Sequence, residues 1–178
     1  MSIKMRKQDM HHGHKVGVLS VKIAEKLIFD NKTCSNLYKA GLLHDYGKAL
    51  IDQDVLNKKG KLTEEEYELI KPHARLSAEI AKKQGYNQYI VDSILYHHEN
   101  HDGTGYNGLI GYDTHFGARI LRVADMYTAL TTNREYRRAY STEQAIEIMD
   151  QLNKYFDPVI YKILKNIVLT KVAGGLRR

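Results

Sequence analysis

The sequence predicts an all-α fold, arranged as a single bundle of about seven helices. Apolar residues recur every three or four positions along almost every segment, which is the pattern of a helix with one buried face. Alternating strand patterns are absent, and only residues 108–114 could form a short extended piece. With 178 residues and two prolines, the chain suits one domain with a substantial core.

Helical periodicity divides the chain into successive segments with recognisable starts and stops. Thr63 with Glu66 is a capping box, in which each side chain bonds the backbone of the other residue, and it opens one helix. Ser141 with Gln144 is a second such pair. Pro72 interrupts the segment that follows Thr63, because proline lacks a backbone N–H. In chain order, the expected segments are 16–27, 37–47, 63–71, 72–85, 90–98, 116–127, 141–152 and 157–167.

Composition and charge exclude several classes of protein. The net charge of +6 favours anionic partners such as nucleotides. The basic residues are scattered, without a stripe interleaved with aromatics, so a DNA or RNA polymer is not expected as a partner. No apolar run is long enough for a membrane span or a signal peptide, so no membrane association is expected. The single cysteine, Cys34, excludes an intramolecular disulfide and fits a cytoplasmic location.

The nine histidines call for an explanation by position. Several of them, with two aspartates, fall on or beside helix faces that should be buried: His14, His44, Asp45, His73, His97, His98 and Asp125. A buried imidazole or carboxylate without a partner costs several kcal/mol. Each one alone is more often a hydrogen-bonded residue at a helix end. Taken together, they are better explained by shared metal coordination.

Imidazole and carboxylate ligands without thiolates suit iron, manganese, nickel or zinc. A carboxylate has two oxygens and can bridge two ions. Two ions about 3.5–4 Å apart can hold a hydroxide and bind the oxygens of a phosphate during in-line displacement. The sequence therefore predicts two divalent metal ions, with iron or manganese favoured over nickel, zinc or magnesium.

The motifs resemble those of a known family. His44-Asp45-Tyr46-Gly47-Lys48 resembles the HD-x-GK signature of the HD phosphohydrolases. The later segments HHENHDGTGYNG and ARILRVADMYTALTTNREYR are similar to the HD-GYP subgroup, whose best-known members hydrolyse cyclic di-GMP. The order of the motifs also matches, over residues 14–164. The resemblance implies an HD-type helical bundle at residues 14–170, with a lead-in at 1–13 and a tail at 171–178, whose last residues, 172–178, we expect to be frayed.

This resemblance also implies roles for individual residues. One ion is expected between His14, His44, Asp45 and Asp125. The other is expected between Asp45, His73, His97 and His98. Asp45 is thus a bridging, catalytic residue, and Lys48 is expected to stabilise charge on the substrate phosphate. Glu99 and Asp102 are expected to orient imidazoles by hydrogen bonds. Substrate contacts are expected from Gly105, Tyr106, Arg134 and Arg137.

Some positions depart from the subgroup's pattern. Asn107 stands where the proline of the GYP motif is expected, and Thr128 replaces an aspartate. Replacing Asn107 with proline should stiffen the loop and strengthen binding of a cyclic dinucleotide. Met10 lies where members with a third metal carry a glutamate, so two ions are expected. His11 and His12 could add an adventitious ligand, but they are expected to be exposed residues near the N-terminus.

The predicted function is a dinuclear metal-dependent phosphodiesterase that hydrolyses cyclic di-GMP by attack of a metal-bridging hydroxide on phosphorus. Two alternatives stay open. One is an HD phosphohydrolase acting on another nucleotide or on a phosphomonoester. The other is a catalytically weak module that binds nucleotides or docks a signalling protein, which the full set of metal ligands argues against. A homodimer is also left open.

Overall fold

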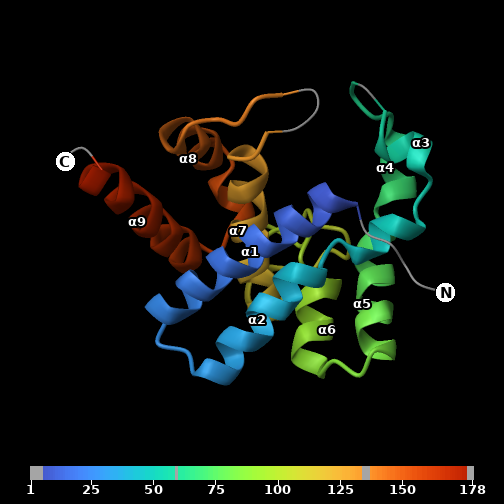
Figure 1. Cartoon of the computed structure of the whole chain (residues 1–178), viewed down its shortest axis with the longest axis horizontal. Coiled ribbons are helices and arrows are strands. Elements are labelled where there is room, and N and C mark those ends of the chain that lie inside the picture. The colour runs from blue at the N-terminus through green and yellow to red at the C-terminus, as the bar shows by residue number, and fades with distance from the viewer. Residues whose placement is uncertain (1–5, 59, 134–136, 176–178) are drawn as a thin grey trace.

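The computed structural model describes residues 6–58, 60–133 and 137–175, and they confirm the all-α fold. In chain order, the helices are α1 (Lys7–Lys26), α2 (Asn31–Leu43), α3 (Gln53–Leu56), α4 (Glu64–Ile70), α5 (His73–Lys83), α6 (Gln88–Leu95), α7 (Phe116–Leu130), α8 (Thr142–Gln151) and α9 (Pro158–Gly175) (Figure 1). A 3₁₀ turn, η1 (Tyr46–Leu50), follows α2. Both predicted capping boxes, at Thr63 and Ser141, are formed.

Helices α1 and α2 cross at glycines, and this close crossing builds one side of the site. A Cβ added at Gly17 would lie 2.7 Å from the Tyr38 carbonyl oxygen, and one at Gly41 would lie 2.6 Å from the Gly17 Cα. Side chains larger than hydrogen would therefore push the two helices apart. The crossing brings the start of α1 against the end of α2, where the ring centres of His12 and His44 lie 5.4 Å apart.

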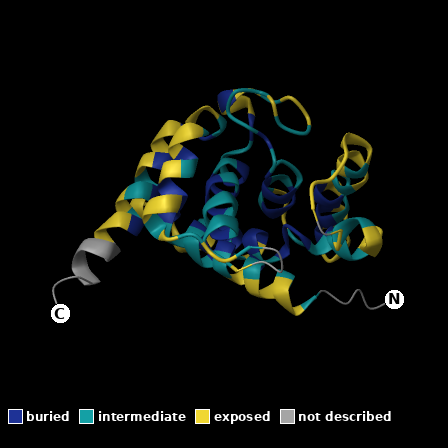
Figure 2. Ribbon diagram, turned by 90° about the horizontal axis from the view of Figure 1, so that it is seen from above, coloured by how far each residue is buried: buried dark blue, intermediate teal, exposed yellow. Residues whose placement is uncertain are grey.

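The core lies where α1, α2, α6, α7 and α9 meet. Ile23, Leu37, Ile94, Leu121 and Ile160 are almost fully buried there. Each such side chain contributes about 1.5–3 kcal/mol by leaving water. Figure 2 shows the buried residues on the inward faces of the helices, with exposed residues on the outer faces. Helix α7 is buried on one face, and it carries Asp125, which is partly buried.

The turn after α2 is tied directly to α5. The backbone N–H of Gly47 donates to the hydroxyl of Ser77 at 2.7 Å, and that hydroxyl donates to the His73 carbonyl at 2.8 Å. A Cβ at Gly47 would lie 2.3 Å from the same carbonyl oxygen. Only glycine fits between η1 and α5, so the His44–Asp45 pair and His73 are held close together.

Three local expectations differ from the structure. Helix α1 begins at Lys7, well before residue 16, and α9 continues to Gly175, beyond the start of the expected fraying at 172. The stretch 108–114 contains a 3₁₀ turn at Gly111–Asp113 in place of an extended piece. The short α3 is stabilised by Asp52, whose side chain accepts a hydrogen bond from the Asp54 N–H. No described helix is both long and apolar enough to cross a membrane.

Candidate metal centre

Histidines and aspartates from five parts of the chain converge beside the core. Two groups of three could each hold a metal ion, since their donor atoms lie within 4.8 Å of one another. The first group is His12 on α1, His44 after α2, and Asp125 on α7. The second is His73 at the start of α5, with His97 and His98 after α6. A third such group, formed by His44, Asp45 and His97, joins the two.

Three of the imidazoles are oriented by the same hydrogen bond. Nδ1 of His44 lies 2.7 Å from the Gly41 carbonyl oxygen, Nδ1 of His73 lies 2.8 Å from that of Ile70, and Nδ1 of His97 lies 2.6 Å from that of Ile94. In each case the carbonyl is three residues earlier. Because a carbonyl only accepts, each Nδ1 carries a proton, and each Nε2 offers a lone pair whenever its ring is neutral.

The Nε2 atoms of His44 and His97 are buried and have no hydrogen-bond partner among the described residues. A buried acceptor without a partner is costly, so such atoms need an explanation. Metal coordination supplies one, because a neutral imidazole binds a metal through this lone pair. The donor set, of imidazoles and carboxylates without thiolate, fits divalent transition metals.

Asp45 lies between the two groups with one oxygen toward each. Its Oδ1 is 3.3 Å from Nε2 of His73, and its Oδ2 is 3.4 Å from Nε2 of His44. The Oδ2 atom also accepts a hydrogen bond from Nζ of Lys48 at 2.6 Å. Asp45 is 4% exposed, so its charge is held inside the protein by these neighbours.

The pKa values in the cluster are shifted in opposite directions. Burial disfavours the charged form of each group, but the charges of Asp45 and Asp125 outweigh it and raise the pKa of His44 to about 9. Burial lowers the pKa of His97 to about 3, and the neighbouring His44 and His73 add to this effect. Burial would raise the pKa of Asp45, yet His44 and Lys48 hold it well below its usual range. Without metal, His44 is therefore protonated and His97 is neutral.

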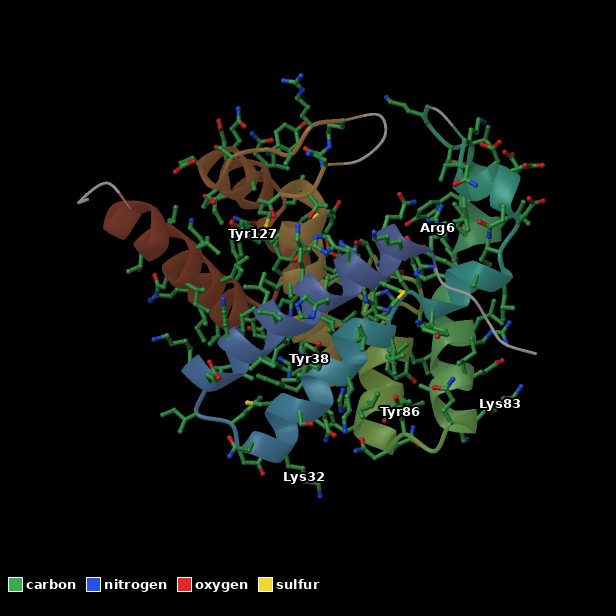
Figure 3. All side chains as sticks on the ribbon, viewed as in Figure 1. Arg6, Lys32, Tyr38, Lys83, Tyr86 and Tyr127 are labelled. Carbon is green, nitrogen blue, oxygen red and sulfur yellow. The ribbon has the colours of Figure 1, made fainter. Side chains whose placement is uncertain are left out.

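His12, and not His14, reaches the first group. The Nε2 atom of His12 lies 2.8 Å from Oδ1 of Asp125, and the His12 side chain is 13% exposed, so the expectation of an exposed residue is wrong. His14 is exposed, and its Nδ1 bonds the hydroxyl of Tyr38, a residue labelled in Figure 3, at 2.9 Å. His14 also lines a separate cavity of about 460 Å³ with Tyr127.

Helix phase explains the difference between these histidines. His12 precedes the buried Val16 by four residues, so the two side chains share one face of α1. His14 stands two positions further along, roughly 200° around the helix. The spacing of the apolar residues in α1 therefore indicates that His12, and not His14, lies on the buried face.

Glu99 and Asp102 bond the backbone of the following loop, and no bond from either to an imidazole appears in the described part of the chain. Oε1 of the buried Glu99 accepts from the backbone N–H of Asn107 at 2.8 Å and from its side-chain amide at 2.9 Å. Oε2 accepts from the Leu109 N–H at 2.9 Å. Asp102 accepts from the N–H and hydroxyl of Thr104. The expectation that they orient imidazoles is corrected accordingly.

Of the expected substrate contacts, Tyr106 packs against the cluster. Its ring centre is 4.6 Å from that of His98. Gly105 packs against the backbone, since a Cβ there would lie 2.5 Å from the Glu99 Cα. The Arg137 guanidinium donates to the carbonyls of Ala129 and Leu130, next to the end of α7. Arg134 lies outside the described residues. Thr128, at the position of the expected aspartate, is buried.

A family model described as an HD domain matches residues 2–160. The chain belongs to the HD domain family. The adjacent His44 and Asp45 are the pair that the sequence had singled out for this resemblance, and they lie at the junction of both candidate groups.

Known relatives agree with the HD-GYP resemblance. The chain is 34% identical over 169 residues to a cyclic di-GMP phosphodiesterase of Pseudomonas aeruginosa, covering 94% of this chain and 41% of the relative. It is 34% identical over 156 residues to the 3'3'-cGAMP-specific phosphodiesterase 3 of Vibrio cholerae, covering 86% and 34%. Among solved structures, an HDG"Y"P protein from Bdellovibrio bacteriovorus aligns with a TM-score of 0.72 at 26% identity, covering 89% of this chain and 52% of that one. The chain thus spans less than half the length of these two curated relatives.

Proposed function

We propose that this domain is a metal-dependent phosphodiesterase of cyclic dinucleotides, with cyclic di-GMP as the favoured substrate. The observation that carries the proposal is the position of Asp45 between two three-residue groups, with one oxygen toward each. That arrangement suits two ions that share a carboxylate. His12, His44 and Asp125 would hold one ion, and His73, His97 and His98 would hold the other. Two bound divalent ions would supply a water of lowered pKa and positive charge for the phosphate oxygens.

The protein's own groups prepare the site for an anion. Backbone carbonyls hold Nδ1 of His44, His73 and His97, so these three rings are already oriented before ligands bind. Lys48 is half-buried at the edge of the cluster, with Nζ on Asp45. We propose that it stabilises negative charge that develops on the phosphate. Tyr106, whose ring packs on His98, would stack against a base of the substrate beside the ions.

The relatives support the class of substrate. Those compared above are named for cyclic di-GMP and for 3'3'-cGAMP, which are both cyclic dinucleotides. A cyclic dinucleotide is an anionic diester and fits the net charge of +6. Iron or manganese is the proposed metal, because nitrogen and oxygen ligands suit both. Such a nucleotide substrate would place the protein in the cytoplasm.

The decisive experiment is metal analysis followed by product analysis. Protein purified without oxygen should contain about two divalent ions per chain. Reloaded with manganese or ferrous iron, it should convert cyclic di-GMP to a linear dinucleotide or GMP, which chromatography would separate. Cyclic di-AMP, 3'3'-cGAMP and a phosphomonoester complete the panel. Turnover of only the phosphomonoester would move the assignment to a general HD phosphohydrolase. Binding of nucleotide without turnover by fully metallated protein would support the signalling-module alternative.

A further inference from the structure

Arg122 is a half-buried arginine beside the candidate metal centre, and none of the roles above uses it. It lies on α7 three residues before Asp125, which is about 4.5 Å along the helix axis and on the same side. Its guanidinium carbon lies 5.8 Å from the ring centre of Phe156, which is itself 1% exposed. The guanidinium therefore lies beside a buried aromatic ring of the core.

Two neighbours fix the orientation of this guanidinium. Nε of Arg122 donates to Oδ1 of Asn100 at 2.9 Å. The Asn100 amide in turn donates to the Thr104 hydroxyl at 3.0 Å, which assigns Oδ1 as the acceptor for the arginine. Asn100 follows the candidate ligands His97 and His98 by only a few residues. The arginine is therefore tied to the same loop that carries them.

The charge of Arg122 acts on the groups of the site. Burial lowers the pKa of Arg122, while the carboxylate of Asp125 and the hydroxyl of Tyr106 counteract it. Burial lowers the pKa of His98, and the positive charges of its surroundings, Arg122 among them, lower it further. These effects agree with the position of Arg122 on the same side of α7 as Asp125 and with its hydrogen bond to Asn100.

What distinguishes Arg122 is its lack of an anion. Within the described residues, no carboxylate forms an ion pair with it, and its two terminal nitrogens have no hydrogen-bond acceptor but stay accessible to solvent. Arg119, one turn earlier on the same helix, is paired with the buried Asp157. A half-buried cation held rigidly without an anion is unfavourable unless a ligand supplies the negative charge.

We propose that Arg122 binds a phosphate group of the substrate at the metal centre, with Asn100 as the residue that positions its guanidinium. This inference rests on the proposed phosphodiesterase function. A guanidinium presents parallel N–H donors that match two phosphate oxygens. The ligand class is thus a phosphate or phosphodiester seated beside Asp125, and Arg122 determines affinity for the anion and not for a particular base.

The test compares variants of manganese-loaded protein. Inorganic phosphate binding is measured by calorimetry, and bis(p-nitrophenyl) phosphate gives kcat and KM. Arg122→Gln should weaken phosphate binding and raise KM about tenfold to hundredfold, with manganese content unchanged. Arg75→Gln is the matched control, because Arg75 is an exposed arginine that pairs with Glu79 on α5. Arg75→Gln removes the same charge, and it should change neither the affinity for phosphate nor KM.

Asn100→Asp separates substrate binding from a structural role. Aspartate keeps the acceptor for Arg122 and would strengthen the contact, so a purely structural arginine would tolerate it. If Arg122 binds phosphate, the new carboxylate neutralises the charge of the guanidinium. Phosphate binding should then weaken, as in Arg122→Gln. This variant also decides the matter if Arg122→Gln loses manganese or fails to fold.

Several results would overturn the proposal. Wild-type affinity for inorganic phosphate in Arg122→Gln, or in Asn100→Asp, would return Arg122 to a structural role. Loss of cyclic di-GMP binding with intact phosphate and cyclic di-AMP binding would assign Arg122 to guanine and reject the phosphate contact. If the wild type cleaves no cyclic dinucleotide while its phosphate binding still depends on Arg122, then the proposed function fails and this inference stands.

Discussion

The histidine–aspartate cluster and the loop beside it, residues 100–110, are held in place by different kinds of bonds. In the cluster, His44, His73 and His97 each bond a carbonyl of the helix turn immediately before them. These bonds are local, so the orientation of each histidine depends only on the helix turn that precedes it. In the loop, Asn107 and Leu109 depend on one carboxylate, that of Glu99, which lies eight and ten residues earlier.

This difference separates two properties of the site. The proposed metal binding depends on several independently oriented side chains, so the loss of one should remove one ion at most, with Asp45 as the exception. Loop shape is built around a single acceptor, so one substitution can change it without disturbing the metals. Variants on the two sides should therefore fail in different ways.

Asp45→Ala should have the largest effect, because its two oxygens face the two groups. We expect both ions to be lost and activity with them. His73→Ala should deplete mainly one ion, since it belongs to one group. Metal content of the two variants, measured on anaerobically purified protein, checks this. Full occupancy in Asp45→Ala would reject the bridging role.

Lys48→Ala should keep both metals but lose rate. Its Nζ contacts Asp45, and its proposed role is to stabilise charge in the transition state. Loss of one such contact reduces kcat by about 10²–10³. Comparing kcat with metal content separates this effect from lost coordination. Unchanged turnover would make Lys48 only a partner for the Asp45 carboxylate.

His12→Ala and His14→Ala form a matched pair on one helix. His12 contacts Asp125, whereas His14 contacts Tyr38 on the other side of α1. His12→Ala should weaken one metal site at least about tenfold to hundredfold, which is the loss seen for residues that merely orient a ligand. His14→Ala should leave metal affinity unchanged, as metal titration would show. The reverse result would restore the assignment made from the sequence motif.

The features that can be predicted from the sequence are those that depend on contacts between residues close together in the chain. The helices follow from periodicity and capping, which are local, and the four-residue α3 is too short to give a periodic signal. The convergence of His44, Asp45, His73, His97, His98 and Asp125 was expected from residue type and motif order. Choosing His12 over His14 required the phase of α1, which the apolar pattern contained.

The bonds of Glu99 and the position of Arg122 could not be predicted in this way. Glu99 next to two histidines suggests an orienting role, and only the folded loop shows that Asn107 returns to it. Arg122, within the stretch Ile-Leu-Arg-Val, is compatible with a solvent-facing residue of an amphipathic helix. Its contact with Asn100 joins residues 22 positions apart. Both features depend on tertiary contacts that no local pattern encodes.

Metal affinity should fall as the pH falls. The carboxylates of Asp45 and Asp125 overcome the opposing effect of burial and raise the pKa of His44 to about 9. Below that pH the metal-free imidazole carries a proton, which must leave before a metal binds. Because of His44 alone, the apparent affinity for metal should drop about tenfold for each unit that the pH falls between 9 and 7. Calorimetry in buffers of different ionisation enthalpy should detect about one proton released at pH 7.5. Binding that is independent of pH would exclude His44 as a ligand.

Asn107→Pro should have the smallest effect and should spare the metals. Proline removes the backbone N–H and the side-chain amide, which both donate to the buried Glu99, and leaves only the Leu109 N–H. A stiffer backbone would favour binding by about 0.4–1 kcal/mol, but hydrogen bonds to a charged group contribute about 1.5–3 kcal/mol each. The lost bonds should therefore outweigh the gain, which reverses the expectation from the motif alone.

The expected result for Asn107→Pro is binding of a cyclic dinucleotide weakened by at least about tenfold, with faster hydrogen exchange at the Leu109 amide. Asn107→Ala is the control, because it keeps the backbone donor and loses only the amide, so its effect should be smaller. Metal content should stay constant in both, since His97 and His98 precede the loop and are oriented without it. Tighter binding in Asn107→Pro would mean that stiffness outweighs the bonds to Glu99. The loop would then be held by its glycine turns, and the contrast with the cluster would disappear.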